Sequence, residues 1–478
     1  MSKYQYDVTV IGGGSGGLVA ARVTAALGAR TCLIDKKELG GDCLHYGCVP
    51  SKSLIHAAKI VKTAKEAALL GEGLEGHNFK VDMAKVTQRI KGIIERVGET
   101  EEVYIKDVTV KFGQAEFKSP HELILNGEVL TSQSFIIATG SSPQRAKNIV
   151  GLEEIGYLTN EGVFDLLHLP GAVAIIGGGP IGVELSQAFA RLGSQVTILQ
   201  GSTRILPKEE LEVSQEVAKA LERDGVRIMT STRPEKAWRN EAGQKVLEAK
   251  QGGQSVQIAV DEIIVALGRT PNVNNLKLEA AGIKFEAKGI EVNDYLQTTA
   301  DNIYAVGDVL GGYLFTHVAA YQAGIAARNV ILPIAKKKAD YTVLPWVTFS
   351  DPEASRVGLT EEEAITKHGK IKVIRFDWKD IDRAQTQGET EGFIKLILNE
   401  KGEEILGAHL VGAGSGEMLA EITLAMQHKL GISGIIATIH AYPTIATGLQ
   451  TAAFEAYMDS MALASSKRIL KPLLNLRG

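Results

Sequence analysis

Two cysteines with the potential for redox chemistry lie five positions apart. They belong to the segment Gly40-Gly41-Asp42-Cys43-Leu44-His45-Tyr46-Gly47-Cys48-Val49-Pro50-Ser51-Lys52. At this spacing Cys43 and Cys48 can close a small loop, and Cys48 stands next to an expected helix start and near Lys52. A thiolate in that position is stabilised by the helix dipole and the positive charge. Two unrelated core cysteines would leave the neighbouring glycines unexplained, and a zinc site lacks a second Cys/His pair at suitable spacing.

A glycine-rich turn lies near the start of the chain. Gly12, Gly14 and Gly17 form a Gly-x-Gly-x-x-Gly motif between an expected strand and an expected helix, and Asp35 ends the next strand. Such glycines permit a tight turn and bring a pyrophosphate close to the helix N-terminus, while the acid can bind a ribose hydroxyl pair. The pattern predicts a dinucleotide-binding unit over residues 6–35.

The same pattern recurs over residues 172–200. Its glycines are Gly177, Gly179 and Gly182, but here the second strand ends in Gln200, with Arg204 just beyond. An acid at the strand end favours the free ribose of NAD, whereas an arginine accommodates a 2′-phosphate. The second unit therefore favours NADPH over NADH. The alternative is that Arg204 is an ordinary solvated charge in a loop.

The order of expected elements indicates an α/β fold. A chain of 478 residues is too long for one core and should form roughly three domains. Two strand–turn–helix–strand units imply two Rossmann-like nucleotide-binding domains. Between them residues 53–110 are expected to be helical and residues 108–140 rich in strands, and residues 343–478 form a separate α+β domain.

Composition excludes several classes of protein. The chain has 52 basic and 56 acidic residues and a net charge of −4, which argues against nucleic acid as a partner. No apolar stretch is long enough to span a bilayer, and no secretion signal precedes the first expected strand. The three cysteines, Cys32, Cys43 and Cys48, are too few for a secreted disulfide scaffold. A cytoplasmic location is therefore expected.

Nearly the whole chain resembles the pyridine nucleotide–disulfide oxidoreductases. Besides the motifs above, the resemblance rests on Ala138-Thr139-Gly140, Ala266-Leu267-Gly268-Arg269-Thr270-Pro271-Asn272 and Ile303-Tyr304-Ala305-Val306-Gly307-Asp308. It implies FAD as the cofactor, NADPH or NADH as the electron donor, and a homodimer. The implied domains are FAD-binding parts at 1–150 and 276–342, an NAD(P)-binding domain at 151–275, and a C-terminal dimerisation domain at 343–478.

The resemblance also assigns roles to single residues. Cys43 and Cys48 would form a redox-active disulfide, with Cys48 against the flavin in a charge-transfer complex and Cys43 exchanging with substrate. Lys52 would lie near the flavin and pair with Glu184. The residues implied for FAD are Gly12, Gly14, Gly17, Asp35, Lys52, Thr139, Gly140, Gly268 and Asp308. Those implied for NAD(P) are Gly177, Gly179, Gly182 and Arg204.

The chain departs from the family near its C-terminus. Disulfide-reducing members carry a His-Pro followed four residues later by Glu, whereas this chain has Tyr442 and Thr447 at those positions. The change argues against ordinary glutathione reductase or dihydrolipoyl dehydrogenase activity. Tyr442 resembles the mercuric reductase branch, but this chain lacks that branch's C-terminal cysteine pair. His440 would either transfer protons or hold the interface together.

The physiological acceptor therefore stays open at this point. The expected function is reduction of a disulfide or another small thiol-reactive acceptor. The alternatives are dihydrolipoyl dehydrogenase activity, a flavin NAD(P)H oxidase that reduces oxygen, quinones or metal ions, and a non-enzymatic flavoprotein subunit. No resident metal is expected. The basic, apolar tail at 467–477 would pack at an interface or touch an acidic partner or a membrane surface.

Overall fold

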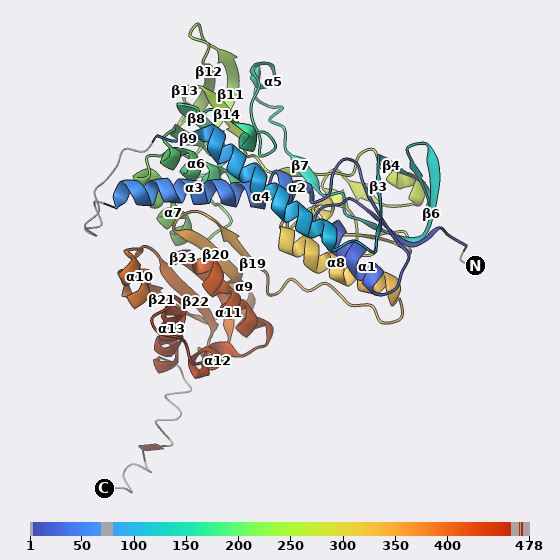
Figure 1. Cartoon of the computed structure of the whole chain (residues 1–478). Helices are drawn as coiled ribbons and strands as arrows, with labels where there is room; N and C mark the ends of the chain where they lie inside the picture. Colours follow the sequence, from blue (N-terminus) through green and yellow to red (C-terminus); the bar gives the residue numbers. More distant parts are fainter. Residues whose placement is uncertain (1–2, 68–79, 460–467, 469, 472–478) are drawn as a thin grey trace. The chain divides into compact units, whose positions relative to one another are not determined.

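Residues 6–35 fold as the expected strand–turn–helix–strand unit, with β1 at Tyr6–Ile11, α1 at Ser15–Ala26 and β2 at Thr31–Asp35. The computed structural model describes residues 3–67, 80–459, 468 and 470–471 (Figure 1). The chain divides into two units. The first comprises Met1–Ala57, Val81–Leu169 and Ile263–Asp340, and the second comprises Ala58–Lys80, Pro170–Glu262 and Tyr341–Gly478.

The first unit is built on a seven-stranded sheet of order β3-β2-β1-β6-β5-β4, in which β18 also pairs with β6. The strands around β1 run parallel, and β4, β5 and β6 form an antiparallel meander. The added strands are β3 (Thr109–Phe112), β4 (Ala115–Ser119), β5 (Glu122–Leu125), β6 (Glu128–Ile137) and β18 (Ile303–Ala305). Parallel strands around a glycine turn match the dinucleotide-binding arrangement.

Alternating side chains of β1 supply both faces of this sheet. Val8 and Val10 pack with α1 and with α8 (Thr316–Ile331), whereas Ile11 belongs to the core on the opposite face. The two helices are far apart in sequence but lie side by side (Figure 1). Gly16 lies at this contact, where an added Cβ would be in ordinary van der Waals contact with the backbone oxygen of Ala319, at 3.4 Å.

The remaining elements associated with the first unit are shorter or connect its parts. Residues 40–52, which carry Cys43 and Cys48 and are called the redox segment below, form α2 (Gly41–His45) and the start of α3 (Cys48–Glu66). Helix α4 spans Met83–Val103. β7 (Ser141–Pro143) pairs antiparallel with β15 (Arg269–Pro271). The others are α5 (Leu152–Ile155), β14 (Glu262–Val265), β16 (Phe285–Glu286), β17 (Gly289–Ile290), and the 3-10 turns η1 (Val163–Asp165), η2 (Leu278–Ala281) and η3 (Gly307–Leu310).

The second unit contains the second nucleotide-binding motif. Its strands β8 (Ala172–Ile176), β9 (Gln195–Leu199) and β10 (Arg227–Met229) run parallel. They are connected by α6 (Pro180–Leu192) and α7 (Leu211–Arg223). An antiparallel meander of β11 (Thr232–Arg239), β12 (Lys245–Gln251) and β13 (Gln254–Val260) follows.

The C-terminal part of this unit is a five-stranded antiparallel sheet of order β19-β20-β23-β22-β21. Its strands are β19 (Pro345–Thr348), β20 (Glu353–Gly358), β21 (Ile371–Asp377), β22 (Phe393–Asn399) and β23 (Ile405–Gly412). The helices are α9 (Glu361–His368), α10 (Asp382–Gln387), α11 (Ser415–Gln427), α12 (Gly431–Ala437) and α13 (Ala446–Met458), with the turn η4 at Trp378–Asp380. A continuous core joins this sheet to α11, α12 and α13.

The expected fold class is confirmed: two parallel nucleotide-binding sheets and an α+β C-terminal part. The boundaries placed at residues 150, 275 and 342 stay a prediction. Within the described residues no helix is long and apolar enough to cross a membrane. The basic tail predicted to pack at an interface lies outside the described residues, except for 468, 470 and 471.

Candidate active site: a cysteine pair beside a dinucleotide-binding turn

The first glycine turn has a backbone that side chains would obstruct. Gly12 adopts a φ of +104°, and a Cβ there would lie 2.3 Å from the Ala138 oxygen. A Cβ on Gly17 would lie 1.7 Å from the Gly12 oxygen, so this glycine lets the helix pack against the strand. Gly14 differs, because the nearest atom to its Cβ would be 3.7 Å away. The open space at the start of α1 fits a pyrophosphate that approaches the backbone.

Asp35 closes this turn from the end of β2. Its Oδ2 accepts a hydrogen bond of 2.7 Å from the Gly13 N–H, and its Oδ1 accepts from the N–H groups of Lys37 and Glu38. The carboxylate is therefore fixed beside the turn. It stands at the position from which an acid binds the ribose of a dinucleotide.

The second turn repeats the backbone features of the first. Gly177 has a φ of +117°, and a Cβ on Gly182 would lie 1.9 Å from the Gly177 oxygen. A Cβ on Gly179 would meet nothing within 4 Å. Each glycine thus has the same local reason to be glycine as its counterpart in the first unit, and the start of α6 also fits a pyrophosphate.

Gln200 takes the place in the second turn that Asp35 takes in the first. Its Oε1 accepts a hydrogen bond of 3.1 Å from the Gly178 N–H, and its Nε2 donates to the Arg204 oxygen at 3.2 Å. Arg204 itself turns back on its own loop. Its Nη2 donates to the backbone oxygens of Pro207 and Glu209 at 3.1 and 2.8 Å. The structure thus gives Arg204 a loop-closing contact that the sequence did not indicate.

The two cysteines meet where three helices begin. Cys43 lies in α2, Cys48 is the first residue of α3, and Thr316 is the first residue of α8. The Cys48 Sγ lies 3.5 Å from the Thr316 Oγ1. Both cysteines are free thiols in this structure, Cys43 half-buried and Cys48 exposed. Helix N-termini carry partial positive charge, so this location stabilises a thiolate.

The two sulfurs are not equivalent. A hydrogen bond to Cys48, followed by burial, raises the pKa of Cys43 far above its usual value, although the hydroxyls of Thr316 and Ser15 oppose the shift. The two thiols also differ in exposure, since Cys43 is half-buried and Cys48 is exposed. The third cysteine, Cys32, is buried in β2, and burial raises its pKa to about 11.

A network of charged and polar side chains contacts the redox segment at Asp42. Arg269 Nη2 lies 3.0 Å from Asp42 Oδ1, next to Cys43 in sequence, and its Nε donates to the Ser141 Oγ at 2.7 Å. The Ser141 hydroxyl donates to Asp308 at 2.6 Å. Burial raises the pKa of Asp308, and the Ser141 hydrogen bond partly offsets this. Asp42 and Ser141 were missed in the sequence, and only the adjacency of Asp42 to Cys43 could have signalled its importance.

The remaining predicted cofactor residues line the same region of the first unit. Thr139 donates through Oγ1 to the Asn272 oxygen at 2.9 Å, and the Asn272 N–H donates to the Gly140 oxygen at 2.9 Å. Gly140 and Gly268 have φ values of +69° and +118°, in which a side chain would be strained. Together they fix the strand ends next to Asp308.

Lys52 and Glu184 lie in different units. Lys52 is half-buried in α3, one helical turn after Cys48. Glu184 is 6% exposed in α6, and its Oε1 accepts a hydrogen bond of 2.9 Å from the Phe349 N–H. Their pairing stays a prediction.

The two C-terminal candidates have contrasting surroundings. The His440 side chain is 5% exposed, and its Nδ1 and Nε2 lie 2.9 Å from the Thr438 oxygen and 2.8 Å from Glu421 Oε1. Both neighbours accept hydrogen bonds, so both ring nitrogens donate only when the ring carries two protons. Tyr442 is 73% exposed, and its hydroxyl donates to Asp382 at 2.8 Å, which raises its pKa. Glu421 as a partner of His440 was not predicted from the sequence.

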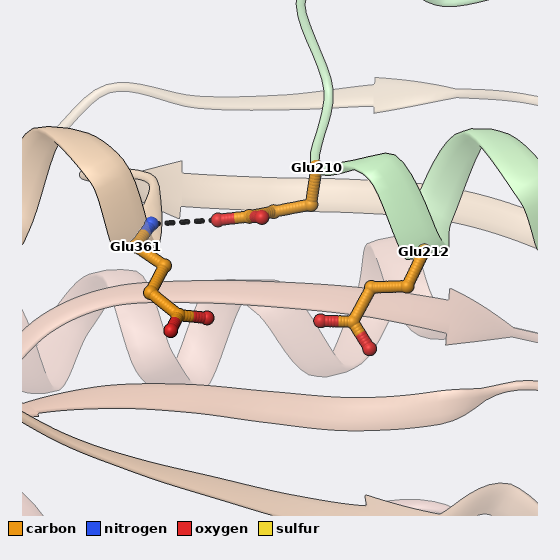
Figure 2. Close-up of side chains that lie close together, drawn as sticks. All are labelled: Glu210, Glu212 and Glu361. Atoms are coloured by element: carbon orange, nitrogen blue, oxygen red, sulfur yellow. Dashed lines mark hydrogen bonds between the residues drawn. The ribbon is translucent and has the colours of Figure 1, made fainter.

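Three carboxylates gather in the second unit. Among the described residues, Glu210, Glu212 and Glu361 alone lie close enough together to hold a metal ion (Figure 2). The Glu361 N–H also donates to Glu210 at 2.6 Å. However, the Nζ of Lys395, whose side chain is 4% exposed, lies 3.5, 2.6 and 2.8 Å from Glu210, Glu212 and Glu361. The lysine ammonium already serves as the cation of this cluster.

His409 lies beside the same cluster, and its lowered pKa should make the stability of the protein depend on pH. Burial, followed by Arg356 and Lys395, lowers its pKa to about 3. In the unfolded chain His409 takes up a proton near pH 6.5, whereas in the folded chain it stays neutral down to about pH 3. The free energy of unfolding is therefore highest above pH 6.5 and decreases as the pH falls toward 3. At pH 5 the loss from this residue should be about 2 kcal/mol.

The variant His409→Gln keeps a side-chain hydrogen-bond donor but cannot titrate. We expect urea unfolding at pH 5 and pH 7.5 to show a smaller pH-dependent loss in this variant than in the native protein. An identical loss in both proteins would assign the acid sensitivity to other groups.

Comparison with known proteins identifies both parts of the chain. A family model described as pyridine nucleotide-disulphide oxidoreductase matches residues 6–324, and a model of the dimerisation domain of the same family matches residues 344–453. Mercuric reductase from Staphylococcus aureus is 35% identical over 455 residues, covering 94% of this chain and 82% of that protein. Dihydrolipoyl dehydrogenase from Thermus scotoductus is 38% identical over 465 residues, covering 94% of this chain and 96% of that protein.

A solved structure has the same fold along almost its whole length. The HOCl-induced flavoprotein disulfide reductase RclA from Escherichia coli has a TM-score of 0.84 and 30% sequence identity, and the match covers 94% of this chain and 99% of that chain. A Cu(II) complex of RclA matches equally well, with a TM-score of 0.84.

Proposed function

The chain belongs to the pyridine nucleotide-disulphide oxidoreductase family, and from that premise we propose that it reduces a soft metal ion or another thiol-reactive acceptor through Cys43 and Cys48. Proteins of this family are oxidoreductases that use FAD and NAD(P)H, and the dimerisation domain supports a homodimer. The choice of acceptor and the roles of single residues are the proposed part. A cytoplasmic location also stays a prediction.

The observation that carries the proposal is the side chain of Tyr442. In place of a histidine the chain presents an exposed tyrosine, whose hydrogen bond to Asp382 raises its pKa above its usual value. Such a hydroxyl keeps its proton at neutral pH and cannot act as the base for a thiol. Thr447, at the usual glutamate position, donates to the Thr444 oxygen at 2.6 Å and has no acidic group to orient a base.

A metal acceptor needs no such base. Reduction of a disulfide requires a proton for the thiol that leaves, whereas two electrons convert Hg(II) to Hg(0), or two Cu(II) to two Cu(I), without a protonated leaving group. Thiolates are also preferred ligands of the soft ions Hg(II) and Cu(I), which are the first acceptor and the product of the second reaction. Relatives are named for Hg(II) reduction or have been solved with Cu(II), which supports this acceptor class.

The residues of the chain then divide the work. FAD, when bound, relays two electrons from NAD(P)H to the cysteine pair. Gly12, Gly14, Gly17 and Asp35 would hold its ADP part, and Asp308 with Arg269 would hold the side of the cofactor nearer the cysteines. Cys48 would carry the thiolate that faces the flavin, and Cys43 would exchange with the acceptor. The His440 side chain is buried and lies within hydrogen-bond distance of Glu421. We therefore assign His440 a positioning role, in which it holds the loop that carries Tyr442.

A dihydrolipoyl dehydrogenase is the second candidate, favoured by the 38% identity to such an enzyme. The deciding experiment measures oxidation of NADPH and NADH by the FAD-loaded protein with Hg(II), Cu(II), glutathione disulfide, lipoamide and a quinone. We expect the metal ions to be reduced at least about tenfold faster than either disulfide. Lipoamide as the best acceptor would overturn the proposal in favour of the dehydrogenase.

A restored dyad provides the matched control. The double variant Tyr442→His, Thr447→Glu should increase disulfide reduction while it leaves metal-ion reduction nearly unchanged, because only the disulfide reaction uses a general acid–base pair. A positioned acid–base group contributes about 10² or more in rate. If the native protein already reduces disulfides as fast as the double variant, the missing dyad is not what selects the acceptor.

A further inference from the structure

The second nucleotide turn contains a cation that the sequence motif does not indicate. Gln200 and Asp35 occupy equivalent places, since each accepts the N–H of the residue after the first glycine of its turn. In this fold the end of the second strand faces the adenosine ribose. A group that distinguishes a 2′-hydroxyl from a 2′-phosphate must therefore lie beside Gln200.

Strand β11 is held at this place by backbone hydrogen bonds. The Thr232 N–H donates to the Gln200 oxygen at 2.9 Å, and the Ser231 N–H donates to the Ser202 oxygen at 2.8 Å. Arg233 follows directly. Its side chain packs on Gly201, where an added Cβ would lie 2.9 Å from the Arg233 Nε. Glycine at 201 thus makes room for the guanidinium beside Gln200.

Arg233 is also available for a ligand. The residue is exposed, and within the described ranges 3–67 and 80–459 its side chain makes no hydrogen bond or ion pair. Arg204, which the sequence favoured, instead donates through Nη2 to the carbonyls of Pro207 and Glu209. The two arginines therefore have different tasks: Arg204 closes the loop, and Arg233 presents free donors next to the ribose position.

We infer that Arg233 and Gln200 together recognise the 2′-phosphate of NADPH. A guanidinium binds phosphate oxygens through two parallel hydrogen bonds. A neutral glutamine at position 200 avoids the repulsion that a carboxylate would exert on that phosphate. This inference rests on the proposed function only in taking a pyridine nucleotide as the electron donor.

The test uses two small probes and needs no electron acceptor. Isothermal titration of the FAD-loaded protein with adenosine 2′,5′-bisphosphate and with AMP measures the contribution of the 2′-phosphate directly. We expect the bisphosphate to bind at least about tenfold more tightly than AMP. Arg233→Gln should remove most of that ratio and leave AMP binding unchanged, whereas Gln200→Asp should reverse the preference.

Arg227→Gln is the control for net charge, because Arg227 is likewise exposed and begins the adjacent strand β10. This control should leave the ratio unchanged. Equal binding of the two probes by the native protein would overturn the inference, as would a ratio that survives Arg233→Gln but is lost in Arg204→Gln. Neither result would affect the cysteine chemistry, and failure of the acceptor test would leave the probe titration valid.

Discussion

The variant Cys48→Ser should lower the rate of NAD(P)H-dependent reduction of Hg(II) or Cu(II) by at least about a hundredfold. The variant Cys43→Ser should lower this rate by a similar factor. Each variant removes one of the two sulfurs that must store and deliver the electron pair. The rate is measured as NAD(P)H oxidation at saturating acceptor. Cys32→Ala is the control for the third thiol: this residue is buried in β2, so the variant should lose stability but keep its activity.

The two serine variants should differ in their absorbance. In the proposed assignment Cys48, the exposed thiol at the start of α3, is the sulfur that faces the flavin. Cys43→Ser leaves Cys48 free, so its FAD-loaded form should show the long-wavelength band of a thiolate beside a flavin without added reductant. Cys48→Ser should lack that band. If both variants still reduce the metal ions at the native rate, the cysteine pair is bypassed and the protein acts as a flavin oxidase.

Replacing Lys395 by methionine should destabilise the protein by about 3 kcal/mol. Burial alone lowers the pKa of this lysine, but its hydrogen bonds to Glu212 and Glu361 outweigh that effect and raise it, which shows how strongly the cluster favours the charged form. Without it, three carboxylates repel one another. Because Glu212 and Glu361 are partly exposed, we expect the lower end of the range found for broken buried pairs.

Urea unfolding measures this loss, with Lys372→Met as the control. Lys372 lies on the adjacent strand β21 and donates from the surface to the Asp459 oxygen, so its replacement should change stability by less than about 1 kcal/mol. Adding Glu212→Gln to Lys395→Met should recover part of the loss, since it removes one of the repelling charges. A loss below about 1 kcal/mol for Lys395→Met would mean that the cluster contributes little to stability.

The glycine turns could be predicted from the sequence because their causes are local. A positive φ at Gly12 and a close approach at Gly17 depend on atoms within one strand–turn–helix unit, and the same holds for Gly177 and Gly182. The fold class followed from the repeat of that unit. Helix ends depend on finer detail: α11 ends at Gln427, because Lys429 adopts a φ of +53° and the Leu430 N–H donates to the Ala425 oxygen.

The partners of the site residues could not be predicted, because they come from distant segments. Arg233 reaches Gly201 only because β11 pairs with the chain after β9, and Glu421 reaches His440 from α11. Arg204 shows the opposite case, in which spacing suggests a ligand but the loop uses the side chain for itself. Nothing in a one-dimensional pattern separates a free guanidinium from one that is already bonded to carbonyls.

The lysine cluster has a consequence for recombination within this family. Glu210 and Glu212 belong to the nucleotide-binding segment, but the cation that neutralises them comes from β22, more than 180 positions later. A chimaera that transplants residues 170–262 from a relative lacking these acids would leave the buried Lys395 with Glu361 as the one remaining acid of the cluster. Gln200 and Arg233 do not belong to the cluster of Lys395 and its three acids. Single substitutions at these two positions should therefore alter the coenzyme preference more easily than exchange of the whole nucleotide-binding segment.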